Sequence, residues 1–117
     1  MRAIVLAMVA ITASAAMADE VEDAHRLAVS GRDSYWNCLA REYPRDSHRG
    51  MSEQDFVALM ASACRSERQN FRVALLDYLA LQFPGNDAGA NMTTANKAIE
   101  LAQRDIVTAF VRHKVAK

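Results

Sequence analysis

Two cysteines are the residues of this sequence best suited to chemistry. Cys38 and Cys64 enclose a loop of about 25 residues, a spacing far from the C-x-x-C motif of redox-active dithiols. A zinc site would need two further ligands, and the sequence does not supply them at the usual spacing. An even pair of cysteines in a small exported protein is typical of a structural disulfide. We therefore predict a Cys38–Cys64 disulfide, which should stabilise the fold by about 3.5 kcal/mol.

Arginines and a tryptophan form the second group of candidate site residues. Arg65, Arg68 and Arg72 follow the spacing of one helix face, and Arg41 lies in the helix before it. Guanidinium groups bind carboxylates and phosphates well, so these residues could bind an acidic partner. The alternative is an ordinary solvated face with acidic neighbours. Trp36, if exposed, would anchor a protein partner, and its other interpretation is packing against the third helix.

Glu67 is the unusual acidic residue, because its spacing places it on an apolar stripe between Cys64 and Phe71. A carboxylate at such a position either pairs with a cation or takes up a proton more readily. The first interpretation is an ion pair with an arginine of the preceding helix, Arg32 or Arg41. The second is a pH-sensitive switch.

Patterns typical of enzymes are not found in the sequence. His25, His48 and His113 are scattered along it, and none belongs to an H-E-x-x-H motif. No Ser/His/Asp arrangement, glycine-rich phosphate loop or pair of catalytic carboxylates stands out. His48 with Met51 is a weak pattern for soft metals. We predict a protein that is not an enzyme and uses no cofactor or metal, with a metal or small-ligand carrier as one alternative.

The elements that must position these residues follow a leader. Residues 1–18 combine a basic start, an apolar stretch interrupted by Thr12, and the small-residue site Ala16-Met17-Ala18. This is the pattern of a secretory signal peptide. The apolar run is shorter than a membrane-spanning helix needs, about 20 residues, although an uncleaved anchor is the alternative. We predict a single domain over residues 19–117, located in the periplasm or secreted.

The charge balance of the chain argues against two classes of partner. It carries 14 basic and 14 acidic residues, whereas a dedicated nucleic-acid binder needs many cations to contact phosphates. The same balance argues against strong attachment to anionic lipid. Another exported or envelope protein is the expected partner.

The chain after the leader is predicted to be helical throughout, because it is rich in alanine and shows no period-two alternation. Pro44, Gly50 and Pro84-Gly85 divide it into helices over about 20–43, 53–83 and 93–115. Helices joined by short loops pack as antiparallel neighbours, so we expect an up-down-up three-helix bundle. In such a bundle the two cysteines differ in height by roughly 9 Å. Either the loop from Pro44 to Gly50 climbs along the bundle, or the start of the second helix tilts or frays.

Apolar stripes indicate how the helices should pack. In the first helix the stripe contains Gly31, which either allows a close helix contact or marks a bend. The second helix carries two stripes on different faces, which predicts burial from both sides near its end. The stripe of the first helix is Val21, Ala24, Ala28, Gly31, Tyr35, Cys38 and Leu39. The second helix has a main stripe of Val57, Met60, Cys64, Phe71, Ala74, Leu75 and Tyr78, and a second stripe of Val73, Leu76, Ala80 and Phe83. The stripe of the third helix is Ala95, Ala98, Ile99, Ala102, Ile106, Ala109 and Phe110.

Two segments carry a resemblance to known proteins. They are the aromatic-x-Cys-Leu pattern of residues 35–39 and the Ala-Cys-x-x-Glu pattern of residues 63–67. Residues 24–80 resemble small uncharacterised exported proteins of proteobacteria, which implies an exported helical hairpin with one disulfide and no activity. The chain is also faintly similar to the periplasmic acid-stress chaperones of the HdeA type, although its cysteines lie closer together than in that family.

The sequence thus favours one function over two others. We expect a small exported, non-enzymatic helical protein that binds another protein, as an accessory, inhibitory or immunity-type module. Its expected surface contains Trp36 and the arginines. The alternatives are a stress-responsive chaperone or pH sensor that responds through Glu67, and the carrier already named.

Overall fold

The protein folds into four α-helices. The computed structural model describes the backbone of residues 2–116 and the side chains of residues 17–116. The helices are α1 (Arg2–Ala40), α2 (Glu53–Ser62), α3 (Arg65–Gln82) and α4 (Ala88–Val115), and a short 3-10 helix, η1 (Asp46–His48), lies between α1 and α2. No strand occurs in residues 2–116, so the predicted all-α fold class is confirmed.

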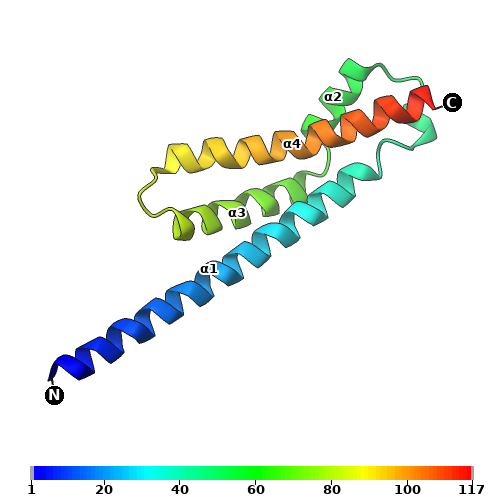
Figure 1. Cartoon of the computed structure of the whole chain (residues 1–117). Coiled ribbons are helices and arrows are strands. Elements are labelled where there is room, and N and C mark those ends of the chain that lie inside the picture. The colour runs from blue at the N-terminus through cyan, green and yellow to red at the C-terminus, as the bar shows by residue number, and fades with distance from the viewer. Residues whose placement is uncertain (1, 117) are drawn as a thin grey trace.

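Helix α1 begins within the predicted leader and continues without interruption into the predicted domain (Figure 1). Its apolar face is the predicted one, since Ala24, Ala28, Tyr35 and Leu39 are all buried. Its N-terminal part projects beyond the other helices, which gives the molecule an extent of 75 × 24 × 22 Å. Among the residues with described side chains, burial in α1 therefore begins at Ala24.

The predicted continuous helix over 53–83 is wrong, because the chain breaks at Cys64 into α2 and α3. Cys64 has left-handed backbone angles, with φ 55° and ψ 47°, a conformation that ends an α-helix. The two halves pack on different partners: α3 lies along α1, whereas α2 lies against α4. The break brings the two cysteines together, which accounts for the height difference expected between them in a continuous second helix.

Helices α2 and α4 each begin at a residue whose side chain caps the helix N-terminus. Ser52 is the N-cap of α2, and its Oγ accepts a hydrogen bond from the Asp55 amide at 3.1 Å. Helix α4, however, starts about a turn and a half before the predicted position at Thr93. Asp87 is its N-cap and accepts from the Ala90 amide at 2.7 Å. An aspartate is a strong N-cap, so the polar loop before Thr93 already contained the true start.

The core gathers aromatic and aliphatic side chains from all four helices. Phe56 of α2 stacks face to face on Phe110 of α4, with ring centroids 3.9 Å apart. Tyr35 is fully buried, and its hydroxyl accepts a hydrogen bond from Gln103 Nε2 at 3.0 Å. These contacts join α4 to both α1 and α2. The buried cluster consists of Tyr35, Leu39, Phe56, Met60, Phe71, Ile99, Ala102, Ile106 and Phe110.

Gly31 allows α1 to pack closely against α3. A Cβ atom placed on Gly31 would lie 3.1 Å from the Cα atom of Phe71, which is tighter than an ordinary contact. The neighbouring atom is backbone and cannot rotate away. Of the two interpretations of this glycine, the close helix contact is therefore correct, and it brings the two helix backbones together.

Candidate functional site

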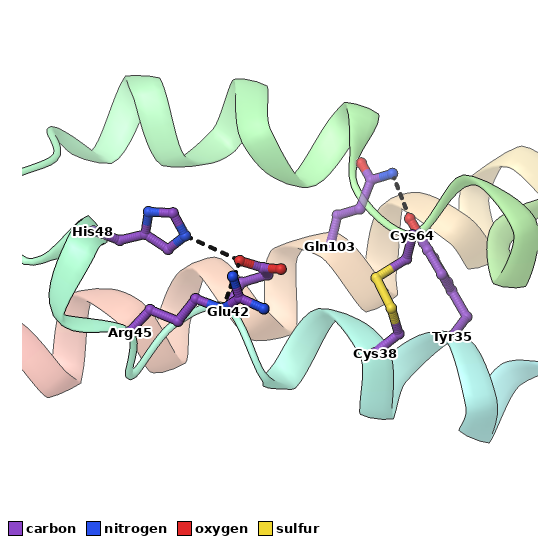
Figure 2. Close-up of a disulfide and its surroundings, with 7 residues drawn as sticks. All are labelled: Tyr35, Cys38, Glu42, Arg45, His48, Cys64 and Gln103. Atoms are coloured by element: carbon purple, nitrogen blue, oxygen red, sulfur yellow. Dashed lines mark hydrogen bonds and ion pairs between the residues drawn. A yellow bond between two sulfur atoms is a disulfide. The ribbon is translucent and has the colours of Figure 1, made fainter.

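The disulfide joins the C-terminal part of α1 to the break between α2 and α3, as Figure 2 shows. The Cα atoms of Cys38 and Cys64 are 6.1 Å apart, within the usual range for a disulfide. Both cysteines are half-buried. The predicted pairing is confirmed, and the bond fixes the residue at which the chain changes partner from α4 to α1.

Glu67 lies beside this disulfide, in the first turn of α3. One of its carboxylate oxygens is within 4.8 Å of the sulfur atoms of Cys38 and Cys64. The side chain is half-buried. Within the part of the chain whose side chains are described, Glu67 makes no ion pair with Arg41, and Arg32 pairs with Asp33 at 3.2 Å instead. Because both sulfurs are used in the disulfide, this cluster offers no thiolate to a metal.

Two of the α3 arginines make hydrogen bonds within this chain. A guanidinium nitrogen of Arg68 donates to the backbone carbonyl of Ala61 in the last turn of α2. This contact satisfies one of the carbonyls that a helix end leaves free. Arg72 donates to Gln69 Oε1 at 2.8 Å. Arg68 thus bridges the break between α2 and α3, in addition to any role toward a partner.

Trp36 lies apart from these arginines. Its side chain is 41% exposed and lines a hollow with Arg32, Asn37 and Asp105 of α4. Arg41 lies five residues after Trp36, in the turn that follows the end of α1. None of the described hollows is lined by both Trp36 and one of the arginines predicted with it.

A polar cluster follows α1 in the loop toward α2 (Figure 2). Glu42 Oε2 lies 3.0 Å from His48 Nε2 and 3.4 Å from Arg45 Nε. Glu42 and His48 are mostly buried, and the His48 ring packs edge-on against Phe56. His48 therefore fixes the loop onto α2. The other two histidines pack elsewhere, His25 on Tyr78 and His113 on Tyr43.

Two adjoining hollows, with volumes of about 490 and 470 Å³, run along the contact between α1 and α3. We call them together the α1–α3 groove. They share Leu27, Ala74 and Asp77, so they form one continuous depression. All the residues that line it come from α1 and α3. Its apolar floor and walls are Ala24, Leu27, Val73, Ala74, Ala80 and Leu81.

Three large apolar side chains of this groove are exposed to solvent. Leu27 is 65% exposed, Val73 49% and Leu81 38%. The sequence predicted that the stripe containing Val73 and Phe83 would be buried, but Phe83 is also 47% exposed. Helix α3 packs against both α1 and α4, as the two stripes predicted, but no described helix covers the part of the second stripe that contains Val73 and Phe83.

Carboxylates surround the apolar floor. Glu20 and Asp23 lie at one end, Asp77 lies near the middle, and Glu67 lies at the other end. No lysine, arginine or histidine is among the residues that line the groove. Asp23 alone of the four has a described ion pair, with the exposed Arg26 at 3.1 Å. Since the whole chain has equal numbers of acidic and basic residues, this acidic character is a local property.

The comparisons with known proteins add no relative. No family model, curated protein or solved structure matches this chain. Among the residues searched, no helix has the combination of length and hydropathy that crossing a membrane requires.

Proposed function

We propose that this chain is an exported, non-enzymatic helical protein that works by binding another protein, and that the α1–α3 groove is the binding surface. The observation that carries the proposal is the exposure of Leu27, Val73 and Leu81 along one depression. Exposed apolar side chains that gather in one place mark interaction sites, whereas single exposed ones are ordinary.

The apolar pattern of α3 supports this surface. Its second stripe follows helical spacing in the sequence, as the stripes that pack in the core do. In the folded chain this stripe faces solvent at Val73. A partner that covers this face removes apolar surface from water, which stabilises the complex by roughly 25 cal/mol for each Å² of apolar surface buried.

Export of the protein is proposed from the leader pattern and supported by the fold. Cleavage after Ala18 would leave every residue with a described buried side chain in place, because burial begins at Ala24. The Cys38–Cys64 disulfide fits an oxidising compartment. Mass spectrometry of the protein isolated from its native host should give an N-terminus at Asp19. A leader that remains attached, together with two free thiols, would remove export from the proposal.

The binding proposal is tested with a photo-activated cross-linker placed at single positions in the living cell. The cross-linker at Val73 should give a covalent adduct with one protein. The matched control position is Leu101 of α4, which is 58% exposed and outside the groove, and it should give none. Adding Leu27→Ser to the Val73 cross-linker chain should remove the adduct.

The same experiment separates the groove from the surface predicted from the sequence. A cross-linker at Trp36 or Arg65 tests that other surface directly. If the adduct forms from these positions and Val73 gives none, the partner binds there and the groove is not the binding surface. If no position gives an adduct, the protein-binding proposal fails as a whole.

A further inference from the structure

We infer that the occupant of the α1–α3 groove is an amphipathic helix of another protein, with basic residues on both sides of its apolar face. This inference rests on the proposed function, because it names the partner chemistry of the same surface. It follows from the dimensions of the groove, from its walls and from its charges.

The length of the groove suits a helix of about four turns. Its lining residues extend from Glu20 to Ser34 on α1 and from Glu67 to Leu81 on α3. At 1.5 Å per residue each wall is about 21 Å long. A helix laid between them would bury its apolar positions on Leu27, as one more member of the helical bundle.

Other modes of peptide binding do not fit the walls. An extended peptide that adds to a sheet needs a strand edge with free backbone groups, and both walls here are α-helices. A polyproline segment needs an aromatic groove, and no aromatic residue lines this one. An amphipathic helix needs an apolar depression between helices, which is the arrangement that Leu27, Val73 and Leu81 provide.

The four carboxylates define the charge of the partner. Asp77 on α3 lies opposite the α1 segment that carries Glu20 and Asp23, so both edges of the groove are acidic. A helix with lysine or arginine flanking its apolar face would place a cation against each edge. Acidic flanks would instead bring like charges together, which reduces affinity and selects against the wrong partner.

The test uses the isolated full-length protein and two synthetic 18-residue helices, a length of about five turns. The peptides share one leucine face, and their flanks are all lysine in one and all glutamate in the other. We expect the lysine peptide to bind at least about tenfold more tightly in a fluorescence anisotropy titration. Its affinity should fall as salt is added, because exposed ion pairs are screened.

Two sets of variants locate the effect. The pair Glu20→Lys and Asp77→Lys should remove the preference for the lysine peptide or reverse it. The matched pair Glu22→Lys and Glu100→Lys changes the net charge equally outside the groove, and it should leave the preference unchanged. Leu27→Ser should weaken both peptides, and its control is Leu101→Ser. Circular dichroism verifies that each variant is folded.

The outcomes distinguish this inference from the proposed function. If Val73 cross-links to a protein in the cell but the two peptides bind equally, protein binding stands and the basic helix is overturned. If the protein self-associates in sedimentation and Asp77→Lys abolishes this, the occupant is a second copy of the chain, which also overturns it. If no peptide binds and no cross-link forms, both proposals are overturned.

Discussion

Removing the disulfide tests whether the break at Cys64 is maintained by side-chain packing or by the covalent bond. The first variant replaces both cysteines by alanine, and the second combines Cys38→Ala with Cys64→Gly. The native bond closes a loop with a sequence separation of 26, which corresponds to about 3.5 kcal/mol of unfolding free energy. Both variants should lose about this amount.

The difference in unfolding free energy between the two variants has a definite sign. If residue 64 keeps its left-handed conformation, with φ 55°, alanine costs about 1–2 kcal/mol there and glycine costs almost nothing. Glycine also makes the unfolded chain more flexible, which lowers the unfolding free energy of the glycine variant by about 0.4–1 kcal/mol. The glycine variant should therefore be the more stable by about 0.5–1 kcal/mol.

We expect the break to persist without the disulfide because other contacts hold α2 away from the line of α3. Phe56 remains stacked on Phe110, and Arg68 still donates to Ala61 at the end of α2. If α2 and α3 instead joined into one helix, alanine would be preferred over glycine by about 1 kcal/mol. The alanine variant would then be the more stable of the two.

Urea titrations followed by circular dichroism measure both quantities from the midpoint and slope of unfolding. An alanine variant as stable as the glycine variant, or more stable, would refute the idea that packing maintains the break. A loss of less than about 1 kcal/mol in both variants would refute the calculation from loop length.

Three further predictions concern single residues. Gly31→Ala should lower stability although alanine favours helices by about 1 kcal/mol, because the new Cβ would lie 3.1 Å from the Phe71 backbone; thermal unfolding checks the sign, and Ser30→Ala on the same helix is the control. Glu67→Gln should speed reduction of the disulfide by glutathione about fourfold, because a carboxylate within 4.8 Å of the sulfurs opposes a developing thiolate by about 1 kcal/mol even in water; an unchanged rate would contradict this. Arg68→Ala should increase amide exchange in the last turn of α2 by removing the hydrogen bond to Ala61, and equal exchange in both proteins would show that this bond does not hold the turn.

The helix faces that form the core could be predicted from sequence because they depend on local periodicity. The α1 face and the α4 stripe are buried at the expected positions, such as Tyr35 and Ile106. The disulfide could be predicted because two cysteines allow only one pairing and the leader pattern indicates an oxidising compartment. Both inferences need the chemistry of the residues and almost nothing of the tertiary structure.

The break at Cys64 and the open groove could not be predicted in the same way. The sequence around Cys64 contains no glycine or proline, so no local turn residue marks the position with left-handed backbone angles. The apolar stripe with Val73 was recognised, but periodicity does not tell whether the surface that covers it belongs to the same chain. The acidic edges of the groove come from two separate helices, so no short motif indicates them.

The change of partner at Cys64 also has a consequence for the order in which the molecule assembles. The α1–α3 hairpin can form as soon as those segments leave the ribosome or the export channel, since its contacts are local to the first 82 residues. Phe56 stacks on Phe110 of α4, which follows it much later in the chain. Segment α2 must therefore wait for α4, and a nascent or clipped chain that lacks α4 would expose Phe56 to chaperones and proteases.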